Sequence, residues 1–127
     1  MADWSALRNY IKGNYKIAKD ELDTLGLLFE TEDGRSQQVF VGNMGDSGWA
    51  MVYTAVCPEG AIEPREALIR NSKMTVGHLA LVEGGPVIFR HTFPLADLDP
   101  EEFETPLHVA VQFGDRLERE LTGADAF

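Results

Sequence analysis

Two histidines, His78 and His91, are the residues whose type and spacing come closest to a reactive or ion-binding pair. They lie in two alternating segments around Gly84-Gly85, and a hairpin loop closed by Val82 and Val87 places them opposite each other. Facing imidazoles can share a transition metal, or repel each other when protonated below about pH 6.5. A metal or pH sensor is therefore one hypothesis. The sequence shows no third ligand, and a shift of one residue in register would separate the pair.

Three other motifs contain the residue types of a reaction centre without its surroundings. Gly45-Asp46-Ser47-Gly48 matches the tetrapeptide around the nucleophile of trypsin-like serine proteases, but it joins two expected strands and has a turn-forming composition. Asp97, Asp99 and Glu101 have the alternate spacing of half a calcium loop, and such acidic residues are typical of a helix start. Cys57 ends an apolar strand with no adjacent base, which favours a small core residue. We expect no catalytic residue and no cofactor.

Length and composition favour one domain in the cytoplasm. A chain of 127 residues can form a single core without a metal, and its one cysteine excludes an intramolecular disulfide. The sequence shows neither a signal peptide nor the run of about 20 apolar residues that spans a membrane. The net charge is −10, and nine acidic against two basic residues follow from Asp97 onward. This charge disfavours nucleic acid and anionic membranes as partners.

The first half of the chain predicts a helix followed by three strands. Asp3 is placed to cap a helix that ends at Gly13, whereas residues 14–24 give mixed signals and are left unassigned. Strands at 27–32 and 35–41 flank Asp33-Gly34, and a two-residue turn there places Leu27 opposite Phe40. The next strand, 49–57, is almost entirely apolar, so we expect it to be central and buried on both faces.

The second half predicts a helix, a hairpin and a long acidic helix. Pro64 opens the first of these helices, the strands span 76–83 and 87–93, and Thr105-Pro106 either kinks the last helix or begins it. A stripe expected to pack on the sheet contains Phe103, Leu107, Ala110, Gly114, Leu117 and Leu121. Val109 and Phe113 form a further apolar pair that a partner chain could cover. Arg35 and Gln37 form either a polar binding patch or a solvated hairpin end.

Several segments, in their order along the chain, resemble the YbjN family of bacterial proteins, also labelled sensory transduction regulators. The matching segments are Gly34-Arg35-Ser36-Gln37, Ala67-Leu68-Ile69-Arg70-Asn71, Gly77-His78-Leu79-Ala80-Leu81, Leu95-Ala96-Asp97-Leu98 and Gly114-Asp115-Arg116-Leu117-Glu118. The resemblance spans roughly residues 25 to 123. It departs from the family at Ala55-Val56-Cys57-Pro58 and at Gly114, where alanine is more usual.

The resemblance implies the type III secretion chaperone-like fold, an α+β fold in which a curved antiparallel sheet packs against helices in the order α-β-β-β-α-β-β-α. Relatives of this fold are small acidic homodimers that hold extended segments of other proteins. We therefore expect residues 1–127 to form one non-enzymatic domain that dimerises and binds an unidentified protein segment, as a chaperone-like or regulatory adaptor. Dimer contacts could use the helix that Pro64 opens or the face of Val109 and Phe113. The candidate contact residues are Val109, Phe113, Arg35 and Gln37.

Overall fold

The computed structural model describes residues 1–122; residues 123–127, which include the end of the YbjN resemblance, lie outside the described part. Its helices and strands are α1 (Trp4–Asn14), β1 (Ile17–Glu21), β2 (Thr24–Glu30), β3 (Ser36–Asn43), β4 (Trp49–Cys57), α2 (Pro64–Ser72), β5 (His78–Leu81), β6 (Val87–Pro94) and α3 (Pro100–Thr122). Single 3₁₀ turns, Glu32–Gly34 and Gly45–Ser47, join β2 to β3 and β3 to β4.

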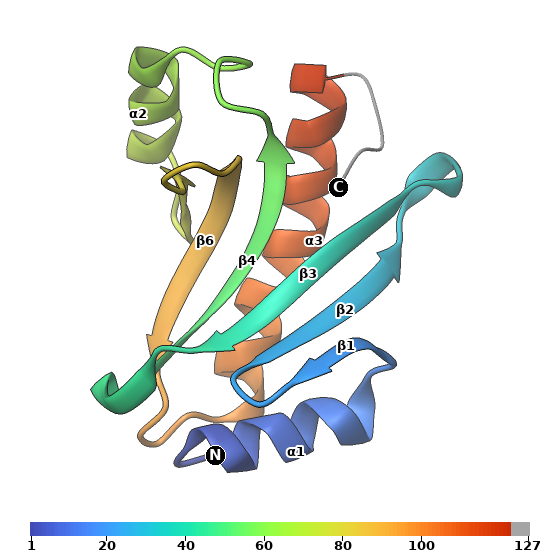
Figure 1. Cartoon of the computed structure of the whole chain (residues 1–127), viewed down its shortest axis with the longest axis vertical. Helices are drawn as coiled ribbons and strands as arrows, with labels where there is room; N and C mark the ends of the chain where they lie inside the picture. Colours follow the sequence, from blue (N-terminus) through green and yellow to red (C-terminus); the bar gives the residue numbers. More distant parts are fainter. Residues whose placement is uncertain (123–127) are drawn as a thin grey trace.

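The strands form one twisted sheet in the order β1-β2-β3-β4-β6-β5, and every neighbouring pair is antiparallel. Helix α3 runs behind β3 and β4, α1 lies across the end of the sheet, and α2 lies beside the edge strand β5 (Figure 1). The opposite face of the sheet carries no helix among the described residues. The α+β architecture with an antiparallel sheet, expected from the sequence, is therefore confirmed.

The unassigned residues 14–24 contain the edge strand β1, which α1 helps to hold. Asp3 caps α1 as predicted by accepting a hydrogen bond from the Ala6 amide at 2.9 Å. The indole of Trp4 donates to the Leu22 carbonyl, and the Arg8 guanidinium to the Glu21 carbonyl. Lys19, Asp20 and Glu21 are exposed on this short edge strand, where charge discourages pairing with other sheets.

The first hairpin forms around Asp33-Gly34, but with a shifted register. Both turn residues have positive φ, 60° and 72°, as the motif predicts. The amide of Thr31, rather than that of Glu32, donates to the Arg35 carbonyl at 2.8 Å, which inserts one extra residue before the turn. The predicted pairing of Leu27 with Phe40 is therefore wrong by one residue.

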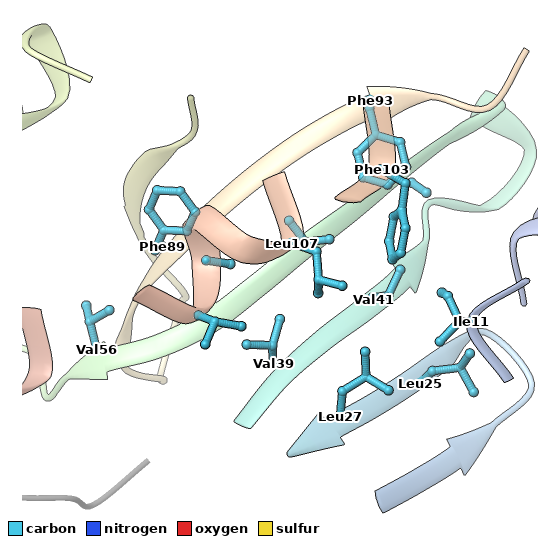
Figure 2. Packing of buried hydrophobic residues seen from close by; sticks show 14 of the residues in the cluster. Ile11, Leu25, Leu27, Val39, Val41, Val56, Phe89, Phe93, Phe103 and Leu107 are labelled. Carbon is cyan, nitrogen blue, oxygen red and sulfur yellow. The ribbon is translucent and has the colours of Figure 1, made fainter. Parts of the chain in front are cut away.

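The shifted register places four apolar side chains of the hairpin on the face toward α3. Leu27 pairs with Val39 and Leu25 with Val41, and all four are buried against α3 and α1. Figure 2 shows them below a layer of aromatic and aliphatic side chains from α3 and β6, which includes Phe89, Phe93, Phe103 and Leu107. The predicted stripe of α3 is thus the side that packs on the sheet.

Strand β4 is central, as predicted, but it is fully buried on only one face. Val52 and Val56 face α3 and have no exposed surface, whereas Met51 and Tyr53 on the opposite face are half-buried. The alternation follows from the single layer of helices, so the expectation of burial on both faces is wrong. Helix α3 is continuous from Pro100 through the buried Pro106, so Thr105-Pro106 begins no new helix.

Candidate protein-binding surfaces

The two histidines of the predicted sensor lie on opposite faces of the sheet. His78 pairs with Arg90, and His91 pairs with Val52, so the predicted pairing of His78 with His91 is wrong by one residue. The reason is the loop, in which the Val82 amide donates to the Pro86 carbonyl at 3.3 Å. Burial lowers the pKa of both imidazoles, with a further contribution from Arg90 at His78 and from His78 at His91. A metal shared by this pair is excluded by the geometry.

Arg35 and Gln37 point into the molecule and form no surface patch, which corrects the prediction that they bind a partner or lie in solvent. The Arg35 guanidinium contacts Asp115 and Glu118 of α3, each at 3.0 Å. The side chain of Glu118 has no exposed surface, and that of Arg35 is 13% exposed. Buried charges are stable when they are paired, so these residues fasten α3 to the first hairpin.

Gln37 belongs to a second buried polar group beneath α3. Its side-chain amide donates to the Thr54 hydroxyl at 2.6 Å, and that hydroxyl donates to the Gln38 carbonyl at 2.7 Å. A methyl group added at Gly114 would lie 2.6 Å from a methyl carbon of Thr54. The absence of a side chain at Gly114 therefore lets α3 approach the polar part of the sheet. An isolated glycine in an apolar helical stripe was the sequence signal for this contact.

The remaining motifs have structural roles. The Ser47 hydroxyl donates to the Met44 carbonyl at 3.0 Å and closes the turn before β4. Asp99 and Glu102 cap α3 reciprocally, because each backbone amide donates to the carboxylate of the other residue. Cys57 is buried in the core, and burial raises the pKa of its thiol. Among residues 1–122 no three His, Cys, Asp or Glu side chains gather as a metal site.

Helix α2, one of the two predicted dimer contacts, and the edge strand β5 carry an exposed apolar surface. We name this the α2–β5 surface and define it by Leu68 and Leu81, 69% and 54% exposed, which line one hollow, and by Ile69 and Val82, 41% and 44% exposed, which follow them in the sequence. All nine residues of α2 lie in the described part, and none is buried. A hollow of about 420 Å³ separates Leu68 on the helix from Leu81 on the strand. Such an unpartnered patch is a feature of interaction sites.

The side chain of Asn71 fixes α2 to the edge of β5. It donates to the Leu79 carbonyl at 3.1 Å and accepts from the Leu79 amide at 2.7 Å. The Asn71 side chain takes the place of a neighbouring strand at one residue of β5 and holds α2 beside the sheet, while Leu68 and Ile69 remain exposed.

Val109 and Phe113 are half-buried and line a second hollow, of about 280 Å³. The segment 73–76 forms the other side of this hollow. The Phe113 ring packs 5.3 Å from the Phe89 ring, and the Arg116 guanidinium lies over it at 5.1 Å. These contacts leave one side of the pair open, and its role in partner binding stays a prediction.

A third hollow, of about 600 Å³, shares one lining residue, Val76, with the second. We name it the β6 groove; it lies between residues 91–94 of β6 and the first turns of α3. Its walls include Trp49 and Phe93, and its rim includes Asp99, Glu101 and Glu102. The lining of the groove therefore combines apolar and acidic side chains.

Comparisons with known proteins identify a fold. No family model and no curated protein matches this chain. Among solved structures, a chain of the HopA1–SchA chaperone–effector complex is similar, with a TM-score of 0.67, 10% sequence identity and coverage of 91% of this chain and 91% of that chain. The fold is therefore type III secretion chaperone-like. No helix described in residues 1–122 is long and apolar enough to cross a bilayer.

Proposed function

We propose that this chain is a non-enzymatic adaptor that binds a segment of another protein in a chaperone-like or regulatory role. The observation that carries the proposal is the fold, whose solved neighbour belongs to a chaperone–effector complex. The exposed α2–β5 surface supports a second part of the proposal, the homodimer. The resemblance to the YbjN family, a single domain over residues 1–127 and a cytoplasmic location are parts of the same proposal.

The α2–β5 surface is the part that we assign to homodimer formation. A two-fold interface uses the same patch on both copies, so an apolar helix beside an edge strand can pack against its own equivalent. Leu68 and Ile69 are suited to the centre of such an interface, and the ion pairs of Arg70 with Glu66 and Glu120, at 3.1 and 2.6 Å, to its polar rim. Val109 and Phe113 are less suited because the chain itself covers them in part.

Light scattering coupled to size exclusion tests the dimer. The wild-type chain is expected to run as a dimer, and Leu68→Asp as a folded monomer, because the substitution buries an unpaired charge in the interface. Leu22→Asp is the matched control: Leu22 is 81% exposed on the turn between β1 and β2, so the dimer should persist. A wild-type mass that stays monomeric, or a Leu68→Asp variant that stays dimeric, would contradict this assignment.

Cross-linking mass spectrometry in native lysate tests the binding of another protein. Cross-links to a defined segment of a second protein, reduced by competition with excess purified chain, are expected. Recovery of self-links alone would remove the adaptor proposal.

A further inference from the structure

The helix-free face of the sheet, seen from the front in Figure 1, carries a row of side chains that crosses every strand. Residues that pair directly in an antiparallel sheet project to the same face, and Tyr53 projects away from α3. In the order β1-β2-β3-β4-β6-β5, the paired residues of this row are Lys19, Gly26, Phe40, Tyr53, Arg90 and His78. The row is therefore basic toward both ends and aromatic in the middle.

Two glycines let the aromatic rings of the row lie low on the sheet. A Cβ at Gly26 would be 3.2 Å from Cε1 of Phe40, and a Cβ at Gly42 would be 3.6 Å from Cε1 of Tyr53. Each ring thus leans over the neighbouring strand on its β1 side. The two rings stack with centroids 5.3 Å apart, and the Lys19 ammonium lies 5.8 Å from the centroid of Phe40. The stack ends at Tyr53, and no further ring in residues 1–122 packs on the side of Tyr53 toward β6.

Arg90, the neighbour of Tyr53 on β6, holds an uncompensated positive charge. Its Nε is buried without an acceptor, and no carboxylate in residues 1–122 pairs with its guanidinium. At the far end of the row, Glu21 compensates the charge of Lys19 at 3.4 Å. Burial and the charge of Arg90 lower the pKa of His78, so its imidazole is largely neutral at neutral pH. A half-buried guanidinium without an anion calls for a partner, because buried charges are normally paired.

We propose that this face binds a small aromatic carboxylate, whose ring stacks on the free side of Tyr53 and whose carboxylate accepts hydrogen bonds from Arg90. A planar guanidinium matches the geometry of a carboxylate, and offset rings attract each other. One uncompensated cation on a molecule with a net charge of −10 favours a monoanion over a phosphate dianion. The site shares no residue with the α2–β5 surface, so it goes beyond the proposed adaptor and does not depend on dimer formation.

A polymer is a poorer occupant of this row. The row crosses the centre of the sheet, where the strands already pair with each other on both sides, so an extended peptide finds no backbone groups to pair with. Single-stranded nucleic acid requires basic groups along its whole backbone, whereas Glu21 accompanies Lys19 here. A compact ligand with one charge fits these groups better.

The test uses naphthoate as the probe, followed by amide and aromatic nuclear magnetic resonance spectra of the full chain at neutral pH. A ligand of this size is expected to bind with a dissociation constant of about 1 mM. The amides of Tyr53 and Arg90 and the ring protons of Tyr53 should shift. Naphthylmethylammonium, naphthyl phosphate and cyclohexanecarboxylate change the charge or remove the ring, and each should bind at least about fivefold more weakly.

Matched variants locate the site. Arg90→Gln should weaken naphthoate about tenfold, because it removes the charged donors while keeping a long polar side chain. Arg65→Gln makes the same charge change at an exposed position of α2 and should leave the affinity within about twofold. Tyr53→Leu should weaken naphthoate about fivefold but leave cyclohexanecarboxylate within about twofold, because only the aromatic compound stacks.

Four results would overturn the inference: no saturable shifts up to about 10 mM naphthoate, equal affinity for naphthoate and naphthylmethylammonium, tighter binding of naphthyl phosphate, or equal weakening by Arg90→Gln and Arg65→Gln. Failure here is separable from failure of the proposed function. The Leu68→Asp variant tests the dimer and should bind naphthoate as the wild type does, whereas Arg90→Gln should keep the mass of the wild type in light scattering.

Discussion

Gly114 is a residue whose small size the structure explains directly. Alanine there would place its Cβ 2.6 Å from the Thr54 methyl and 3.1 Å from the Gln37 amide nitrogen, both within a buried group that has no free space. The higher helix propensity of alanine contributes about 1 kcal/mol, whereas overpacking costs about 1–3 kcal/mol. We expect Gly114→Ala to lower the free energy of unfolding by about 1 kcal/mol, measured by denaturant titration.

Gly13 offers the matched control for this substitution. It lies in the last turn of α1, and a methyl group there would meet nothing within 4 Å. Gly13→Ala should therefore raise the free energy of unfolding by a few tenths of a kcal/mol to about 1 kcal/mol. If Gly114→Ala raised the free energy of unfolding as much as Gly13→Ala does, α3 would not pack closely on Thr54 in solution.

Single residues also show where the sequence was insufficient. Arg35 and Gln37 have side chains of types that are usually exposed. Nothing in the sequence of the hairpin indicated that Arg35 would form ion pairs with Asp115 and Glu118, about eighty positions later. Composition and spacing describe neighbours along the chain, whereas a buried ion pair depends on which distant element covers the hairpin. The sequence therefore predicted the location of α3 but not the polar contacts beneath it.

At the scale of elements, the predicted helices and strands were largely found, and the errors lie in register. Asp33-Gly34 predicted its turn correctly, yet one extra residue at Thr31 shifted Leu27 onto Val39. The second hairpin slipped by one residue in the same way, which separated His78 from His91. The register of each hairpin is the one that buries its apolar side chains under α3. It therefore depends on tertiary packing, which the local sequence of the hairpin does not show.

Helix α1 is joined to α3 by two tyrosines whose hydroxyl groups donate to one carboxylate. Tyr10 donates to Glu104 at 2.7 Å, and Tyr15 donates to the other oxygen of the same group. The hydrogen bond to Glu104 raises the pKa of Tyr10 above 10.0, and burial together with that hydrogen bond raises the pKa of Tyr15. The folded state thus favours the neutral phenols, so their stabilising effect is complete below the unfolded pKa of about 10 and is lost as pH rises above it.

We therefore expect the free energy of unfolding to fall between about pH 9 and pH 11, and to fall less in the Tyr10→Phe, Tyr15→Phe variant. Denaturant titrations across this range measure the difference in slope. A residual slope is expected in the double variant, because burial also raises the pKa of Tyr53. Identical slopes for the wild type and the double variant would show that the two phenols do not join α1 to α3 in solution.

The molecule as a whole has a well-packed part, which contains the core, and a part whose apolar side chains are exposed. Residues from α3, α1 and the centre of the sheet form one buried cluster, whereas α2 contributes no buried side chain and the edges of β5 and β6 lie beside it. Stability and binding are thus assigned to different parts of the chain. The sequence indicated the packed part through its apolar periodicity, but the exposure of Leu68 and Ile69 depended on α2 lying beside the sheet and not on its face.

This separation predicts that the order of α2 depends on protein concentration. A helix of nine residues with no buried side chain has little stability of its own, since isolated helices shorter than about 12–15 residues are marginal in water. If the α2–β5 surface forms the dimer, amide hydrogen exchange in α2 should slow as the chain is raised from about 10 μM to about 1 mM. Amides of α3 report the packed part and should exchange at a constant rate. In Leu68→Asp the exchange of α2 should be fast at every concentration. The contrary result is slow exchange in α2 at every concentration, in the wild type and in Leu68→Asp alike. It would show that Asn71 and the other contacts to β5 stabilise the helix within one copy. The α2–β5 surface would then lose its assignment as the dimer interface.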